Sequence, residues 1–247
     1  MTERFGTTQA RGRSDGLPGP LERLSDREIE RKRSVAKVTT GVLKYLTNAF
    51  TRNRFEWLLP VAFSKSTDPL WPDPGASIEK RIEVEIYEET VRATLSMIIH
   101  KMVACSLAHP KLFLLSPNIR IEKRERATSG VHTYEFTQFD FEVRNASSQA
   151  IRNMVERTVV GLIRNLKHQL KDELTILGRY RNLRTPKAPF RAHDKEDLVH
   201  EYGERWEARL IAESHDPVWV TNIPREFYDY EDFEQGKWDN YDLLLPG

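Results

Sequence analysis

The segment from Ser116 to Val143 contains the residue types and spacings that could support chemistry. It alternates like two β-strands joined by a charged loop, and Arg120 and Glu122 share one face of the first strand. One face of the second strand carries Tyr134, Phe136, Gln138 and Asp140. The other face carries Glu135, Thr137, Phe139 and Phe141. A half-buried hairpin normally has one polar and one apolar face, so polar groups on both faces predict a ligand-binding floor.

This hairpin resembles motif 2 of the class II aminoacyl-tRNA synthetases, in the version found in the aspartate and asparagine enzymes. The residues that carry the resemblance are the Arg120–Glu122 pair and the run EFTQFDFE. The sequence runs SPNIR, HTYEFTQFDFEV and IPREFYD resemble the archaeal asparagine synthetase-related proteins more closely still. Those proteins are free-standing catalytic cores that amidate aspartate. The resemblance extends from about Phe55 to Gly247.

The resemblance implies a site for ATP with Mg²⁺. In it, Arg120 is the catalytic residue, since a planar guanidinium can bridge phosphate and carboxylate oxygens. Glu122 would contact the adenine amino group or orient the arginine, and Phe136 would stack on adenine. His132 keeps its place in the loop, whereas Val131 replaces an arginine that usually touches the ATP tail. Without the resemblance, a surface ion pair between Arg120 and Glu122 would be the preferred interpretation.

The same resemblance implies a pocket for an amino acid. In the run SMIIHKM, Ser96 and Lys101 keep the spacing of the aspartate-type enzymes, in which the lysine grips a substrate carboxylate. Ile98 stands where those enzymes carry a glutamine, which indicates a re-shaped pocket. Gln138 and Asp140 match residues that hold the substrate's polar groups. A solvated helix lysine is the alternative interpretation of Lys101.

The last part of the chain would add a substrate residue and a metal ligand. Arg225 belongs to the run PREFYD, a signature of the asparagine synthetase-like group, and is assigned to substrate binding. Asp242 matches a carboxylate that helps to bind magnesium near the phosphates. As bare sequence, this acidic and aromatic stretch could equally be a solvated surface loop.

The elements that must position these residues can be read from periodicity and breakers. Ser25 and Glu28 fit a capping box that opens a helix through about Phe50. A strand at 55–63, with Pro60 inside it, resembles motif 1, the dimerisation element; an ordinary edge strand is the alternative. The other predicted elements are a hairpin at 81–87 and 91–95, helices at 97–107, 147–177 and 196–202, and strands at 111–115 and 218–223.

Composition limits the protein class. The chain has 247 residues and a formal net charge of +1, so it has no global basic field for nucleic acid. Its single cysteine, Cys105, excludes an internal disulfide and any multi-cysteine metal site, and it is expected to be buried. No apolar run is long enough to span a membrane, and the first residues contain no apolar signal core. A cytoplasmic location follows as the default.

These features predict one α+β core at residues 21–247, an antiparallel sheet flanked by helices, preceded by a flexible tail at residues 1–20. We expect no anticodon-binding domain. We also expect the core to be C-terminally truncated, because motif 3 is not found before Gly247.

The predicted activity is ATP-dependent activation of aspartate followed by amidation with ammonia, in a homodimer that does not associate with membranes. One alternative is an aspartyl- or asparaginyl-tRNA synthetase core, with tRNA as a disfavoured partner. The other is a non-catalytic paralogue or fragment.

Overall fold

The computed structural model describes residues 24–65, 78–127, 133–224, 231–232 and 237–246. Its α-helices are α1 (Asp26–Arg52), α2 (Ile98–Leu107), α3 (Arg124–Ala127), α4 (Ser148–Gln169), α5 (Lys171–Ile176), α6 (Lys195–Tyr202) and α7 (Trp206–Glu213). Its strands are β1 (Glu56–Trp57), β2 (Phe63–Ser64), β3 (Ile78–Lys80), β4 (Glu83–Ile86), β5 (Glu89–Ala93), β6 (Lys111–Ile119), β7 (Ile121–Glu122), β8 (Glu135–Val143), β9 (Arg191–Asp194), β10 (Val218–Thr221), β11 (Glu231–Asp232), β12 (Lys237–Trp238) and β13 (Tyr241–Leu244). The fold is therefore α+β, with mostly antiparallel pairing and two parallel pairs, β1–β6 and β9–β10.

Strands β6 and β8 form the centre of the fold and pair antiparallel over nine residues, from Lys111 opposite Val143 to Ile119 opposite Glu135. Pro117 lies inside β6 without breaking the pairing. Phe113 O accepts from Leu58 N and Ile119 N donates to Thr94 O, so alternate residues of β6 bond on the side away from β8. Pro117 has the same parity, so its missing N–H is not one that β8 needs.

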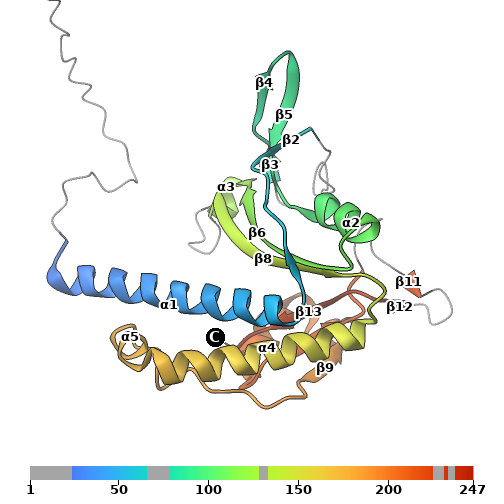
Figure 1. The fold of residues 1–247 in the computed structure, drawn as a ribbon. Coiled ribbons are helices and arrows are strands. Elements are labelled where there is room, and N and C mark those ends of the chain that lie inside the picture. The colour runs from blue at the N-terminus through green and yellow to red at the C-terminus, as the bar shows by residue number, and fades with distance from the viewer. Residues whose placement is uncertain (1–23, 66–77, 128–132, 225–230, 233–236, 247) are drawn as a thin grey trace, which may run out of the picture.

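The two faces of this sheet are covered by different helices. On one face, Phe50 at the end of α1 packs with Phe55, Phe113, Phe139 and Phe141. On the other face, Leu112 and Leu114 of β6 pack with Met97 and with Cys105 of α2, which confirms the burial expected for the cysteine. In Figure 1, α1 and α4 run alongside each other below the sheet, and α2 lies at its other side. Since opposed residues of an antiparallel pair share a face, these cores decide which side chains of β8 face α2.

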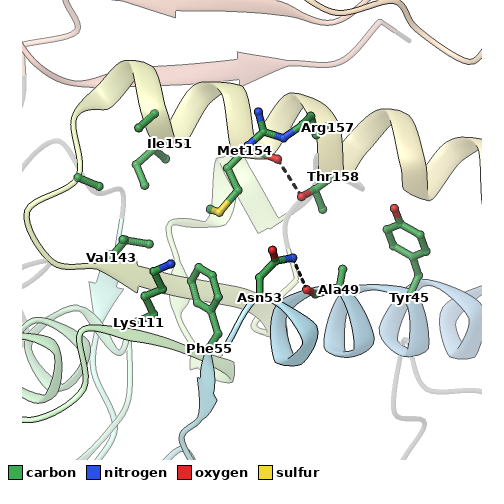
Figure 2. Close-up of a pocket in the computed structure, with 12 residues that line it drawn as sticks. Tyr45, Ala49, Asn53, Phe55, Lys111, Val143, Ile151, Met154, Arg157 and Thr158 are labelled. Atoms are coloured by element: carbon green, nitrogen blue, oxygen red, sulfur yellow. Dashed lines mark hydrogen bonds between the residues drawn. The ribbon is translucent and has the colours of Figure 1, made fainter.

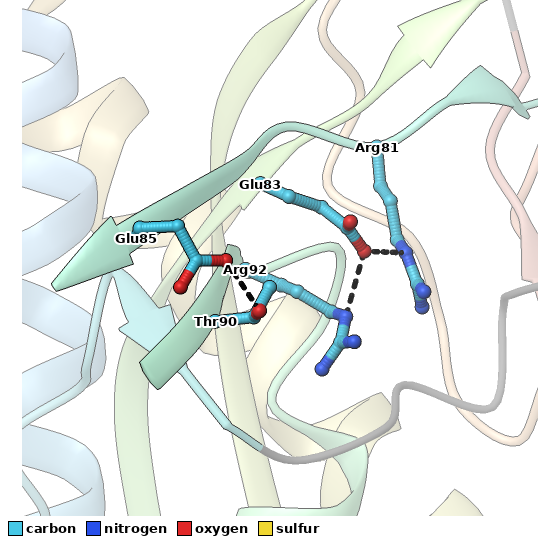
Figure 3. A network of polar contacts seen from close by, with 5 residues as sticks. All are labelled: Arg81, Glu83, Glu85, Thr90 and Arg92. Carbon is cyan, nitrogen blue, oxygen red and sulfur yellow. Dashed lines mark hydrogen bonds and ion pairs between the residues drawn. The ribbon is translucent and has the colours of Figure 1, made fainter. Parts of the chain in front are cut away.

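The β4–β5 hairpin projects from the body of the molecule (Figure 1). Polar contacts connect its strands, as Figure 3 shows. Glu83 Oε1 accepts from Arg92 Nε at 2.8 Å and pairs with Arg81 Nε at 2.7 Å, and these arginines, Arg92 first, hold the pKa of Glu83 below its usual range. Tyr87 and Glu88 form the turn with positive φ, as a tight two-residue hairpin requires.

A second sheet, ordered β13–β10–β9, packs against α4. The contact centres on the buried Glu156 of α4, whose Oε1 accepts from Trp219 Nε1 at 2.8 Å and from the backbone N–H of Phe190 at 3.2 Å. Its core contains Leu198, Leu210, Val218, Val220 and Ile223. Glu156 therefore connects the helix that follows β8 to this sheet. Among the helices of the described part of the chain, none combines the length and apolar character that a membrane span needs.

Most of the expected elements are present, with three corrections. The capping box is confirmed, because Ser25 and Glu28 hydrogen-bond reciprocally at the start of α1. The single strand expected at 55–63 is wrong: β1 and β2 are separate two-residue strands around Pro60, which has no N–H to donate. The expected helix at 147–177 is divided at Leu170 into α4 and α5. The strand expected at 111–115 continues to Ile119, and the following β7 pairs with β3 instead of extending the hairpin.

We predict that Glu156→Ala destabilises the protein by about 2–4 kcal/mol, because two buried N–H donors lose their acceptor. Urea unfolding measures this. Glu156→Gln, which keeps an acceptor oxygen, should lose less. Asn153→Ala, on the exposed side of α4, should stay within about 0.5 kcal/mol of the wild type. Equal losses for the alanine and glutamine variants would contradict the role given to the oxygen.

Candidate active site

The face of β8 toward α2 is the predicted ligand floor. It carries Phe136, Gln138, Asp140 and Glu142, because the alternate residues are anchored in the aromatic core on the other face. Opposite them on β6 stand Asn118, Ser116, Leu114 and Leu112, in that order. The floor is therefore aliphatic at the end under α2, and polar and aromatic at the end near Arg120.

Lys101 projects from α2 over the aliphatic end of this floor. Its side chain is nearly buried, at 11% exposed, and its Nζ lies 3.5 Å from Asp140 Oδ1 and 3.3 Å from Glu142 Oε1. The alternative of a solvated helix lysine is therefore wrong. A buried ammonium between two carboxylates is held at a fixed position, as binding of an anionic group requires.

Glu142 is a site residue that the sequence analysis did not select. It lies two residues beyond Asp140, so strand alternation alone places it on the same face. Burial raises the pKa of Glu142, and the nearby Lys101 opposes this shift without cancelling it. The cluster of Lys101, Asp140 and Glu142 thus holds two acids and one base in a poorly solvated place.

Arg120 lies at the other end of the floor, between β6 and β7. Its backbone N–H donates to Tyr134 O, and its Nε donates to Leu95 O at 2.9 Å. The guanidinium carbon lies 5.0 Å from the centre of the Phe136 ring. The structure thus brings the predicted catalytic arginine to the predicted adenine-stacking residue.

The segment that leads into α2 borders the floor. Ile119 N donates to Thr94 O at 2.8 Å, and Ser96 is buried with its Oγ accepting from Ile98 N at 3.4 Å. Ser96 thus supports the start of α2, which carries Lys101. Gln138 is exposed on the floor itself, and Glu122 lies on β7 opposite Ile78 of β3.

The structure does not place three of the predicted residues in this group. His132 and Arg225 lie outside the described residues. Asp242 lies on β13, opposite Val220 of β10 in the second sheet. Within the described parts of the chain, no group of three or more His, Cys, Asp or Glu side chains could hold a metal ion.

Tyr241, the residue before Asp242, packs against Trp219 of β10 with ring centroids 5.6 Å apart, so strand alternation turns Asp242 to the other face of β13. Burial raises the pKa of Tyr241, the neighbour of Asp242, and the negative charges of Asp239 and Glu142 add to this. Magnesium commonly binds to one or two carboxylates together with substrate phosphates, and the assignment of Asp242 to this role stays a prediction.

Figure 2 shows a separate cavity of about 380 Å³ on the opposite face of the sheet, between α1 and α4. Phe55, Val143, Ile151 and Met154 provide apolar lining, and Lys111 and Arg157 provide charge. The aromatic core separates this cavity from the floor. None of the predicted site residues lines it.

The comparisons with known proteins agree with the α+β fold described above. The family model described as tRNA synthetases class II (D, K and N) matches residues 30–247. The fold is similar to asparaginyl-tRNA synthetase from Pyrococcus horikoshii complexed with asparaginyl-adenylate (TM-score 0.72, 17% identity, 87% of this chain and 51% of that one). It is also similar to the asparaginyl enzyme of Entamoeba histolytica (TM-score 0.74, 16% identity, 90% and 53%). The aspartyl-tRNA synthetase of the same organism gives a TM-score of 0.62 at 14% identity, covering 96% and 50%.

These structures share the fold with this chain at low identity, and the chain spans about half of their length. No curated protein matches it in sequence.

We predict that Glu142→Gln changes how stability depends on pH. A carboxyl whose pKa is raised by folding contributes stability below its unfolded pKa and loses it as pH rises through the folded value. The free energy of unfolding of the wild type, minus that of Glu142→Gln, should therefore be greatest below about pH 4.5 and shrink as pH rises above it through the raised pKa.

Urea unfolding at a series of pH values measures this difference. Thr137→Ala, on the opposite face of β8, removes no titrating group and should keep the wild-type pH profile. Parallel profiles for the wild type and Glu142→Gln would contradict the raised pKa.

Proposed function

The chain belongs to the family of class II tRNA synthetases of the D, K and N type, and from this premise we propose that it activates aspartate with ATP and amidates it with ammonia. The observation that carries the proposal is the pairing of two charged positions on one floor. Lys101 is held between Asp140 and Glu142 at one end, and Arg120 lies over Phe136 at the other. A small dicarboxylic amino acid would pair one carboxylate with Lys101 and direct the other toward Arg120.

In this proposal the nucleotide binds at the Arg120 end. Adenine stacks on Phe136 and contacts Glu122, and the arginine neutralises the α-phosphate as a substrate carboxylate oxygen attacks it. The attack forms the mixed anhydride and releases pyrophosphate. His132 contributes to nucleotide binding from the loop. Positioning and charge neutralisation account for the catalysis, without a covalent enzyme intermediate.

Aspartate binds at the Lys101 end. The Lys101 ammonium pairs with the substrate carboxylate that is not activated, and Asp140 and Gln138 receive the substrate ammonium. Ser96 supports the start of α2, and Arg225 contributes to substrate binding. Ile98 re-shapes the pocket relative to the glutamine of related enzymes.

Magnesium would be held by Asp242 together with the phosphates of ATP. It would supply positive charge to the phosphate oxygens during the attack. The described residues provide no complete protein cage, which fits an ion bound largely by substrate oxygens and water.

A tRNA synthetase core specific for aspartate or asparagine is the second candidate, and its support is the similarity to solved asparaginyl- and aspartyl-tRNA synthetases. It shares the activation step and differs in the acceptor. The net charge of +1 favours ammonia, because tRNA binding relies on basic surface. We place either activity in the cytoplasm.

The segment between β1 and β2 supports the proposed homodimer. Its alternate residues Trp57, Leu59, Val61 and Phe63 are apolar and exposed, and Leu59 is 81% exposed. Strands β1 and β2 pair over two residues each, so most of this segment's backbone lies outside the ladders of the described residues. A second copy would cover such a stripe.

ATP–pyrophosphate exchange, with and without aspartate, tests the proposed function. We expect exchange that depends on aspartate and, once ammonia is added, release of AMP with formation of asparagine. Aspartate-dependent exchange followed by charging of a tRNA transcript would support the second candidate, the tRNA synthetase core, instead of the amidating enzyme. No exchange from folded protein would contradict both.

We predict that Arg120→Lys reduces aspartate-dependent exchange by about 100-fold or more, since lysine cannot bridge phosphate and carboxylate oxygens in a plane. Arg164→Lys, on the exposed side of α4, is the matched control and should retain the activity. Equal effects of the two substitutions would remove Arg120 from its catalytic role.

We predict that Leu59→Glu shifts the protein from dimer to monomer, because a charge cannot be buried unpaired at the interface. Sedimentation velocity at micromolar concentration measures this. Glu56→Gln, at an exposed polar position of the same segment, should leave the dimer intact. A wild-type protein that is monomeric at these concentrations would contradict the assignment.

A further inference from the structure

Two polar side chains are fully buried in the middle of the floor. Along β6, the face toward α2 changes from Leu112 and Leu114 to Ser116 and Asn118, and both polar residues are 0% exposed. Ser116 Oγ and Asn118 Oδ1 find no hydrogen-bond partner among the described residues. Buried acceptors are almost always satisfied in proteins, so two neighbouring exceptions call for a donor.

The orientation of the Asn118 side chain shows which of its atoms lacks a hydrogen-bond partner. Its Nδ2 donates to the backbone oxygen of Ser116 at 2.9 Å, which leaves Oδ1 as the acceptor without a partner. Ser116 Oγ lies on the same face, one strand repeat away. Both groups are uncharged, so the pair suits a small hydrogen-bond donor better than an anion.

This pair lies between the two ends of the proposed site. Asn118 is two residues before Arg120 on the same strand face, about 7 Å away along the backbone. Ser116 is opposite Gln138, and this pair lies two residues along the strands from the Leu114–Asp140 pair. A group held here would stand beside a carboxylate that reaches from Asp140 toward Arg120.

The segment at residues 94–97, beside β6, also contacts the catalytic arginine. Residues 94–97 are buried beside β6, where Thr94 O accepts from Ile119 N and Leu95 O accepts from Arg120 Nε at 2.9 Å. Because Ser116 and Asn118 are 0% exposed, bulk water does not reach their two oxygens. Exclusion of bulk water protects an activated acyl group from hydrolysis.

We propose that Ser116 Oγ and Asn118 Oδ1 form the binding site for the ammonia nucleophile. The inference rests on the proposed function and assigns the amine acceptor to particular atoms. Ammonia is similar in size to water and brings only donors apart from its single lone pair. With its N–H groups on the two oxygens, that lone pair is free to face the activated carbonyl carbon.

The step balances as acyl transfer. The ammonia lone pair forms the C–N bond at the acyl carbon, and the bond from that carbon to the phosphate oxygen breaks, so AMP leaves with the bonding electrons. The nitrogen then loses one proton to water. The products are the primary amide, AMP and one proton, with no oxidant or reductant.

Asn118→Leu tests the site, because leucine has a similar volume and no acceptor. We expect the KM for ammonia in asparagine formation to rise about tenfold more than the KM for aspartate in ATP–pyrophosphate exchange. Ser116→Ala, a smaller change, should shift the same ratio in the same direction. Asn118→Asp, which keeps an oxygen acceptor, should restore most of the ammonia KM. Thr137→Ala, on the opposite face of β8, is the matched control and should leave both constants unchanged.

The possible outcomes separate the inference from the function on which it rests. Equal changes in both KM values, or a lowered melting temperature with an unchanged ammonia KM, would mean that Ser116 and Asn118 are structural, and the inference would fail alone. Absence of aspartate-dependent exchange in the wild type would overturn the proposed function and the inference together.

Discussion

The aromatic contacts between the end of α1 and strands β6 and β8 set the register on which the candidate site depends. The Phe113 and Phe139 rings stack with centroids 5.3 Å apart, and Phe50 meets Phe139 at 4.8 Å and Phe141 at 5.2 Å. Because strand side chains alternate, burying these rings on one face forces Asp140 and Glu142 to the other. A slip of one residue would bury the carboxylates under α1 and remove the floor.

The electrostatics of the floor follow from this register. Two carboxylates meet one nearly buried lysine, so the acids of the cluster outnumber its base, and burial raises the pKa of Glu142. In the proposed function, the substrate ammonium supplies the second positive charge. The cluster would thus be stabilised by its ligand, which is how a preorganised but poorly solvated site gains affinity.

Local pattern allowed much of the fold to be predicted, since the capping box of Ser25 and Glu28, the β4–β5 hairpin and helix α2 depend on nearby residues. Strand alternation also placed Phe136 and Asp140 on one face. The separation of β1 from β2 was not predicted, because Pro60 alone did not show that the two halves pair with different distant strands, β1 with β6 and β2 with β5. The break at Leu170 was not predicted either, and the α5 that follows it packs against the distant α1.

Some residues of the candidate site could be predicted from the sequence, and others could not. Lys101 was selected through the family resemblance, yet periodicity alone could not tell a buried lysine from a solvated one, because burial depends on how α2 crosses β8. Glu142 could have been found, since it follows Asp140 at strand spacing. The buried oxygens of Ser116 and Asn118 could not, because the lack of a partner is a property of the packed structure.

The central claim is that this floor recognises an activated aspartate. Isothermal titration with a stable analogue of aspartyl-adenylate, in which a sulfamoyl group replaces the phosphate, measures this without requiring turnover. We predict tight binding of the aspartyl analogue, weaker binding of the analogue in which the carboxylate that is not activated is replaced by an amide, and loss of this preference in Lys101→Met. Equal affinity for the two analogues, or no binding of either by folded protein, would contradict the account.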